Sequence, residues 1–329
     1  GQPDSHRGSR MIYVLLTYLF YPFLYLLTLL KKKNPPESPY TPLWKRDNPP
    51  KSPFIKGERG GLSREFKKIL VIQTAKIGDM ICSTPVFREI KKKYPMVFLG
   101  VIGDPLSQSV LDNNPYVDET IPVKHTDMKG FLGKLRVANR LRKNNFDMSI
   151  SLQPNVANNV IPLWALIQKR YSIYPNFCGL TFKCSSLLNT LNVPHVLEQS
   201  IVDTYIRLLN KSIGIPIRQD STRLELHPSI TARNKVEEFF KKEGVQDNKL
   251  VGMALAARNK LKELAPYIFA KAADRIFDEF NCKVILIAGS GDKGVMDEVK
   301  KHMTTTPVDS CGVFTLSELP ALMEKLSLF

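Results

Sequence analysis

The stretch that most constrains the fold is residues 67–94. A short apolar run at 69–73 follows two lysines and leads into a turn that contains Gly78 and Asp79. Apolar residues at helical spacing then continue over 80–94. A buried strand, a tight turn and a helix in this order are typical of the opening of a βαβ unit. Because ligands bind at the carboxyl ends of the strands in an open parallel sheet, we expect a functional site at this turn.

The alternation continues along the chain and predicts a first domain over residues 62–224. Strands that alternate with helices indicate a parallel sheet with right-handed connections. The expected strands are 69–73, 97–102, 119–123 and 148–152, and the expected helices are 80–94, 105–112, 129–144 and 195–209. Residues 153–194 have weak periodicity, so no element is predicted there.

A second domain is expected over residues 225–329. Its pattern predicts helices at 229–243, 265–280, 293–302 and 316–326, and strands at 249–255, 284–288 and 311–314. A nucleotide-binding half-domain normally has more than three strands. We therefore expect the second domain to be incomplete and the chain to be truncated at its carboxyl terminus.

The amino-terminal region predicts three segments of different character. Residues 1–10 are polar and form an extension, and residues 11–30 carry no charge and are long enough for a helix to cross a bilayer. Lysines follow this segment, which places the body on the cytoplasmic side. Pro22 and four tyrosines leave a kinked or in-plane helix open as the alternative. Residues 31–61 hold seven prolines and eight Lys/Arg and predict an extended linker.

The charge of the chain favours anionic partners. The net charge is +16, of which residues 1–61 carry 10 Lys/Arg against 4 Asp/Glu. Phosphates, nucleotide sugars and acidic lipids are the expected partners, and no nucleic-acid recognition module is evident. The five cysteines form no C-x-x-C pair, which favours reduced thiols over a disulfide framework or a zinc site.

Several short motifs occur together in order. They are I-G-D at 77–79, T-P at 84–85, Y-P at 94–95, N-P-Y-V-D-E at 114–119 and F-D at 146–147. This series resembles glycosyltransferase family nine, the ADP-heptose:lipopolysaccharide heptosyltransferases and their relatives. The resemblance runs from about Lys67 to the last residue. The H-x-x-E pattern formed by His195 and Glu198 is also similar to the family's. The start of a surface helix, with Glu198 near its positive end, explains these two residues better.

The resemblance implies a role for the first turn. The matching aspartate of the family is the catalytic base, so Asp79 is expected to take the proton of the acceptor hydroxyl. Lys76 would keep Asp79 ionised, and Gly78 would allow a positive φ or the close approach of a ligand. The alternatives are a plain helix N-cap for Asp79, a turn glycine and a solvated lysine.

The resemblance also implies a donor site in the second domain. Lys262, with Lys260 as its alternate, and Arg258 are expected to offset the charge of the donor diphosphate. Gly289 and Asp292 are expected near the nucleotide, and Leu316 beside the base. A solvated basic loop, a strand-exit turn and an ordinary helix start are the alternatives. The family's small hydroxyl residues and tryptophan are replaced here at 256, 257 and 264, which puts the identity of the donor in doubt.

Together these features predict an α/β protein of two facing Rossmann-like domains in the GT-B arrangement, with an amino-terminal membrane-associated helix. The implied reaction inverts the anomeric centre without cofactor or metal, since no D-x-D metal clamp is evident. The implied partners are an ADP-heptose-like nucleotide sugar, a lipid-linked saccharide acceptor and the cytoplasmic face of the inner membrane.

Two other functions were considered. The absence of G-x-G-x-x-G after the first strand argues against a nicotinamide-dependent oxidoreductase. A non-catalytic, membrane-tethered nucleotide- or sugar-binding protein stays open.

Overall fold

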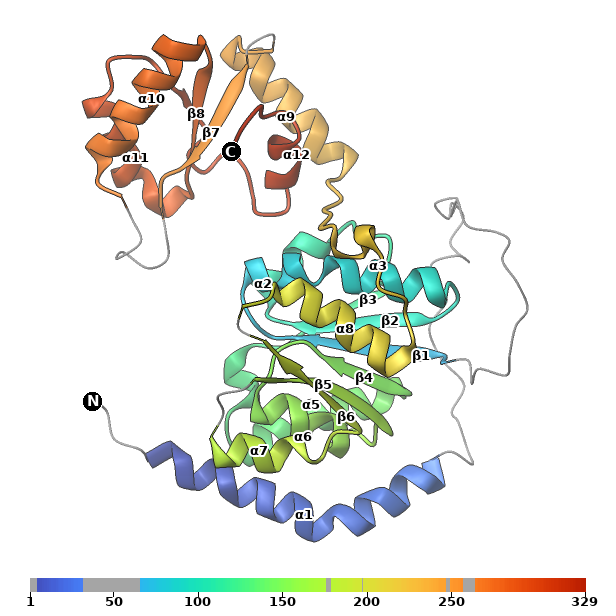
Figure 1. Ribbon diagram of the computed structural model, residues 1–329. Coiled ribbons are helices and arrows are strands. Elements are labelled where there is room, and N and C mark those ends of the chain that lie inside the picture. Colours follow the sequence, from blue (N-terminus) through green and yellow to red (C-terminus); the bar gives the residue numbers. More distant parts are fainter. Residues whose placement is uncertain (1–4, 32–65, 176–178, 197, 247–248, 257–263) are drawn as a thin grey trace. The chain divides into compact units, whose positions relative to one another are not determined.

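The computed structural model describes residues 5–31, 66–175, 179–196, 198–246, 249–256 and 264–329. The chain divides into two compact units, Gly1–Leu226 and His227–Phe329. Each unit has its own sheet and core, and each is described by itself (Figure 1).

Unit 1 is built on a six-stranded sheet in which all paired neighbours are parallel. The strand order is β3-β2-β1-β4-β5-β6, so the direction of winding reverses between β1 and β4. The strands are β1 Lys68–Gln73, β2 Phe98–Gly103, β3 Glu119–Pro122, β4 Met148–Ser151, β5 Lys169–Pro175 and β6 Leu191–His195. The predicted α/β fold with a parallel sheet is confirmed.

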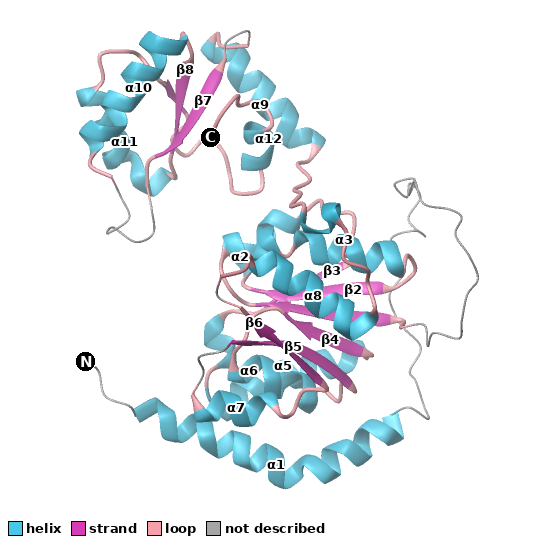
Figure 2. Ribbon diagram, viewed as in Figure 1, coloured by secondary structure: helices cyan, strands magenta, loops and turns pink. Residues whose placement is uncertain are grey.

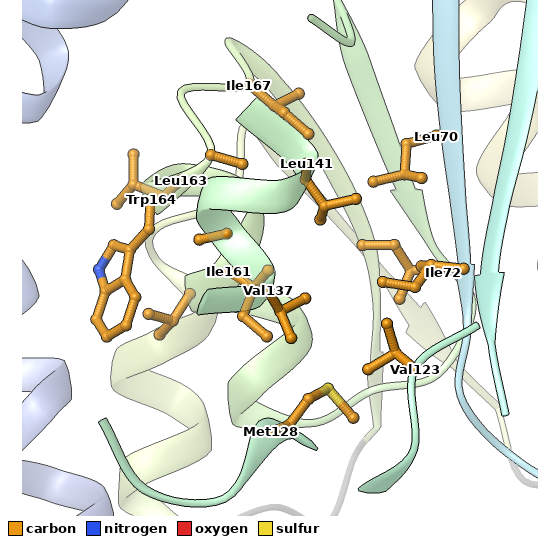
Figure 3. Close-up of a cluster of buried hydrophobic side chains, with 14 of the residues drawn as sticks. Leu70, Ile72, Val123, Met128, Val137, Leu141, Ile161, Leu163, Trp164 and Ile167 are labelled. Atoms are coloured by element: carbon orange, nitrogen blue, oxygen red, sulfur yellow. The ribbon is translucent and has the colours of Figure 1, made fainter. Parts of the chain in front are cut away.

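Helices cover the two faces of this sheet, and its central strands β1 and β4 are buried on both sides (Figure 2). Leu70 and Ile72 of β1 face the cluster formed with α5 and α6, where Val137 and Leu141 lie opposite them (Figure 3). Trp164 extends from the far side of α6, away from the strands. The helices are α2 Ile77–Cys82, α3 Thr84–Lys93, α4 Pro105–Gln108, α5 Gly130–Asn144, α6 Val156–Trp164, α7 Leu180–Ser186 and α8 Ile201–Ile213, with 3-10 turns η2 Ser109–Leu111, η3 His125–Met128 and η4 Gln219–Thr222.

Helix α1, Ser5–Lys31, packs along α6 and α7 of the same unit. Tyr13, Val14 and Thr17 are buried there, and the indole Nε1 of Trp164 donates to Thr17 Oγ1 at 3.0 Å. Within the described part of the chain, no helix is long and apolar enough to cross a membrane, so the spanning helix expected at 11–30 is not confirmed.

Unit 2 has a three-stranded parallel sheet in the order β7-β8-β9. Two apolar clusters, one on α9 and α12 and the other on α10 and α11, pack against its strands. The strands are β7 Leu250–Ala254, β8 Lys283–Ile287 and β9 Val308–Asp309, and the helices are α9 Ile230–Glu243, α10 Pro266–Phe280, α11 Lys293–His302 and α12 Leu319–Met323, with a 3-10 turn η6 at Ser290–Asp292.

Four elements differ from the sequence prediction, two of them in unit 1. The helix expected at 80–94 is two helices, because Pro85 has no N–H to continue the ladder and Thr84 Oγ1 donates instead to the carbonyl of Ile81 at 2.8 Å. The helix expected from His195 begins at Ile201, and His195 ends strand β6.

In unit 2, residues 311–314 form a turn rather than a strand, since Gly312 has a φ of +67°. The last helix is also shorter than the predicted 316–326, because α12 starts at Leu319 with Pro320 in its first turn.

Candidate functional site

The first turn of unit 1 places Asp79 at the carboxyl end of β1, beside the reversal of strand order. Asp79 is the third residue of α2, not its N-cap as one interpretation of the sequence held; the N-cap is Lys76. The Oδ2 atom of Asp79 accepts the backbone N–H of Lys76 at 3.3 Å. The side chain is half-buried, so the carboxylate is oriented by the chain yet reachable from solvent.

Lys76 and Gly78 lie on the exposed side of the same turn. Lys76 reaches Asp79 through its backbone N–H, and their side chains form no ion pair within the described structure. Gly78 is helical and does not have the positive φ that one interpretation allowed. A Cβ built at Gly78 would meet nothing within 4 Å, which leaves open space for a ligand to approach the backbone.

A buried glutamine, Gln73, fixes the conformation of this turn. Its Nε2 lies 2.9 Å from Ser83 Oγ, 3.1 Å from the hydroxyl of Tyr205 and 3.3 Å from the carbonyl of Asp79. Its Oε1 accepts the N–H of Ala75 at 3.3 Å. Ser83 Oγ also donates to the carbonyl of Asp79 at 2.7 Å. The amide of Gln73 therefore joins both ends of the turn that carries Asp79.

Burial keeps the neighbouring hydroxyl and thiol protonated. Tyr205 is 1% exposed, and its burial raises the pKa of its phenol strongly. Burial also raises the pKa of the Cys82 thiol, and the nearby Asp79 carboxylate adds to the effect. Asp79 contributes the carboxylate of this network, the kind of group that can act as a general base.

The sequence analysis did not identify Gln73 or Tyr205 as site residues. Gln73 was counted as the near-apolar end of a strand. A signal was present, because an amide at the end of a central strand, 0% exposed, must find hydrogen-bond partners in the interior. The register of α8 against β1, which brings Tyr205 to Gln73, could not be derived from the sequence.

A cavity of about 810 Å³ lies at the same edge of the sheet. Thr74, which follows β1, and Gln153, which follows β4, line it, so the cavity lies where the strand order reverses. Asn158 Nδ2 joins the two strand ends by donating to Thr74 Oγ1 at 3.1 Å and to the carbonyl of Gln153 at 2.8 Å. The volume is typical of a site for a small molecule.

Two of the residues predicted for the donor site, Gly289 and Asp292, lie at the carboxyl edge of the sheet in unit 2. Gly289 and Asp292 follow β8, and Asp292 precedes α11 as its N-cap. The thiol of Cys311, which follows β9, donates to the carbonyl of Gly289 at 3.3 Å. The structure therefore brings the loops after β8 and β9 together. Leu316, in the segment that follows β9, is half-buried.

The remaining donor-site candidates, Arg258, Lys260 and Lys262, lie outside the described residues. Among the residues that are described, no group of three or more His, Cys, Asp or Glu is placed to hold a metal ion.

Comparisons with known proteins agree on one family. The profile described as glycosyltransferase family 9 (heptosyltransferase) matches residues 134–329. Lipooligosaccharide heptosyltransferase 2 of Haemophilus ducreyi (strain 35000HP / ATCC 700724) is 23% identical over 240 residues. That match covers 71% of this chain and 66% of the relative, so the chain spans just under two thirds of the relative's length.

Two solved structures share the fold. The structure of the glycosyl transferase family 9 protein from Veillonella parvula DSM 2008 has a TM-score of 0.69 at 23% identity, over 82% of this chain and 77% of that one. The Escherichia coli ADP-heptose lps heptosyltransferase II has a TM-score of 0.62 at 20% identity, over 79% and 78%.

Proposed function

Because the chain belongs to glycosyltransferase family 9, we propose that it transfers a heptose or a similar sugar from a nucleotide-diphosphate donor to a lipopolysaccharide-type acceptor. Two of its relatives, a lipooligosaccharide heptosyltransferase and an ADP-heptose lps heptosyltransferase, support this choice of donor and acceptor. In the proposal, unit 1 binds the acceptor and unit 2 binds the donor.

The observation that carries the proposal is the position of Asp79. Its carboxylate is half-buried, oriented by the N–H of Lys76, and lies at the edge of the sheet where ligands bind. Asp79 precedes the region that matches the family profile, so its assignment rests on this geometry and on the I-G-D motif.

The proposed step is a direct displacement. Asp79 takes the proton as the acceptor oxygen forms its bond to the anomeric carbon of the donor, and the bond from that carbon to the diphosphate oxygen breaks. The new bond forms on the face opposite the leaving group, so the configuration inverts. Positive charge near the diphosphate stabilises the leaving group, and Lys262 and Lys260 are the candidates for that role.

Membrane association forms part of the same proposal. Helix α1 buries one face in unit 1 and exposes Leu15, Leu19, Phe23 and Leu26 on the other. The positions i, i+4, i+8 and i+11 form one stripe on a helix. This arrangement favours a helix lying in the plane of the interface over one crossing it.

The lysines at 31–33 favour an anionic leaflet, which supports the cytoplasmic face of the inner membrane as the location.

The direct test combines the full chain with ADP-heptose and a heptose-accepting lipopolysaccharide core. The expected products are ADP and an acceptor heavier by one heptose, with the new linkage of inverted configuration by nuclear magnetic resonance. The same rate is expected with and without a chelator of divalent metals. If ADP binds but no acceptor is glycosylated, the protein is a binding protein and the proposal is wrong.

A further inference from the structure

The cavity at the reversal of strand order has a mainly apolar wall made by three separate segments. Helix α1 contributes a side that faces the first turns of α5 and α6. The apolar lining residues are Tyr13, Leu16, Met128, Phe131, Val156 and Ala157. An apolar wall of this size is suited to a hydrocarbon chain.

Several polar groups beside the cavity are engaged in holding this wall together. The buried ammonium of Lys134 donates to the carbonyls of Met128 and Gly130, each at 2.9 Å, and lies 4.5 Å from the ring centroid of Tyr13. Asn155 Oδ1 accepts the N–H of Asn158 at 2.8 Å and caps α6. These groups brace α1 and the start of α6 around the cavity.

A positive charge lies at the rim. Lys129 lines the cavity and is exposed, directly before the first residue of α5. An exposed ammonium beside an apolar cavity is complementary to a molecule with an anionic group at the end of a hydrocarbon chain.

The cavity is continuous with the exposed apolar stripe of α1. Leu16 lines the cavity and is 38% exposed, and it lies between the buried face of the helix and the stripe that includes Leu19 and Phe23. On the opposite side of the cavity, Phe131 and Leu132 of α5 are also exposed. A chain entering past Leu16 would therefore meet apolar side chains at the entrance and on the wall of the cavity.

We propose that this cavity holds the hydrocarbon chain of an anionic amphiphile, with the charged group of that molecule beside Lys129. The amphiphile is either the lipid part of the sugar acceptor or a phospholipid of the bilayer. The first source rests on the proposed function and the second does not. In both cases α1 forms part of a binding site as well as a membrane-facing surface.

The test uses the fluorescence of dansyl-undecanoic acid with the full chain and no sugar donor, so its outcome is separate from that of the transfer assay. Leu16→Glu places a charge on the cavity wall and should lower the affinity for the probe about tenfold or more. Ile230→Glu, at an exposed apolar position of α9 in unit 2, is the control and should change the affinity less than about twofold.

A second pair of variants guards against a failure of folding. Ala157→Trp fills the cavity and should also lower the affinity about tenfold, whereas Ala272→Trp, on an exposed face of α10, should leave it unchanged. Circular dichroism checks that each variant is folded. If Ala157→Trp does not fold, the affinity of Leu16→Glu for the probe decides the test. Wild-type protein that does not bind the probe, or folded variants that bind it like wild type, would overturn the proposal.

Competition identifies the charged group and the source. Dodecyl phosphate should displace the probe more strongly than dodecanol, and Lys129→Ala should remove most of that difference. Equal displacement by dodecyl phosphate and dodecanol in the wild-type protein would overturn the proposal that the anionic group lies beside Lys129. Stronger displacement by the glycolipid acceptor than by phosphatidylglycerol assigns the cavity to the acceptor, and the reverse order assigns it to the bilayer.

Discussion

The substitution Gln73→Leu tests how unit 1 holds the turn that carries Asp79, the proposed base. Leucine has nearly the volume of glutamine and suits a strand end that is 0% exposed, so packing is retained while every amide hydrogen bond is lost. Ser83, Tyr205 and the N–H of Ala75 each lose one hydrogen bond, but the carbonyl of Asp79 keeps the hydroxyl of Ser83 at 2.7 Å.

The expected loss of stability follows from these contacts. Two hydrogen bonds of ordinary length, at 2.9 and 3.1 Å, are removed. Each is worth about 1 kcal/mol, and leaving a buried polar group of this network short of a partner costs about 1–3 kcal/mol in place of one of them. A total of about 2–4 kcal/mol in the free energy of unfolding is expected, which lowers Tm by about 5–15 °C for a unit of this size. Because a shift of the base by about 1 Å costs about 10²-fold, the transfer rate should fall by that factor.

The assays are thermal unfolding and the rate of sugar transfer at a temperature where every variant is folded. Gln108→Leu is the matched control, since Gln108 is a buried glutamine that donates to the carbonyls of Val101 and Ile121 and not to the turn. It should lower Tm to a similar extent and leave the rate within about threefold of wild type. Equal rates for wild type and Gln73→Leu would refute the claim that Gln73 positions Asp79.

Three further predictions use other parts of the chain. Gly103→Ala should cost about 1–3 kcal/mol of stability by thermal unfolding, because the new Cβ would lie 2.7 Å from the carbonyl oxygen of Gln73; an unchanged Tm would contradict this. Lys262→Ala should weaken ADP binding about 10- to 100-fold by calorimetry, since a charge-assisted contact is worth about 1.5–3 kcal/mol; unchanged affinity would move the role to another residue. Leu19→Glu with Phe23→Glu should abolish sedimentation with phosphatidylglycerol vesicles while Tm stays the same, and continued sedimentation would exclude the outer face of α1 as the membrane contact.

The sheet of unit 1 was predictable where the strands are continuous apolar runs. The segment 69–73 is such a run and lies at the centre of the sheet, where strands are buried on both faces. Its central neighbour, 148–152, instead alternates apolar residues with the buried serines Ser149 and Ser151. Their order along the sheet follows from the βαβ rule only in part, because the reversal between β1 and β4 leaves no mark in the sequence of either strand.

The region 153–194 was not predictable because its elements break the usual patterns. It contains α6, β5, α7 and β6. Helix α6 carries Pro162 and two buried asparagines, and β6 carries Pro194, which is tolerated since β6 is an edge strand. Strand β5 buries Arg170, whose guanidinium donates to the carbonyls of Leu188 and Ile167. Contacts with residues distant in sequence compensate for these unfavourable residues. A local sequence pattern cannot predict such contacts.

The candidate site shows the same division. Asp79 was identified from its motif and its place after a strand, but its neighbours Gln73 and Tyr205 come from packing between β1 and α8. The membrane segment was recognised as apolar, yet the sequence could not show that Tyr13 and Thr17 are buried against unit 1. A helix that is apolar all round has the same sequence pattern whether lipid or protein covers each face.

The central claim is that Asp79 is the catalytic base, and the substitution Asp79→Asn tests it most directly. Asparagine can still accept the N–H of Lys76, so the helix start and Tm should be nearly unchanged, as should the affinity for ADP. The transfer rate should fall by about 10² to 10⁴ because the base is removed. Asp104→Asn is the matched control, since Asp104 caps α4 at the end of the next strand with an equivalent bond to Leu106 N at 3.0 Å, and its rate should stay near wild type. A folded Asp79→Asn protein that transfers sugar at the normal rate would contradict the account.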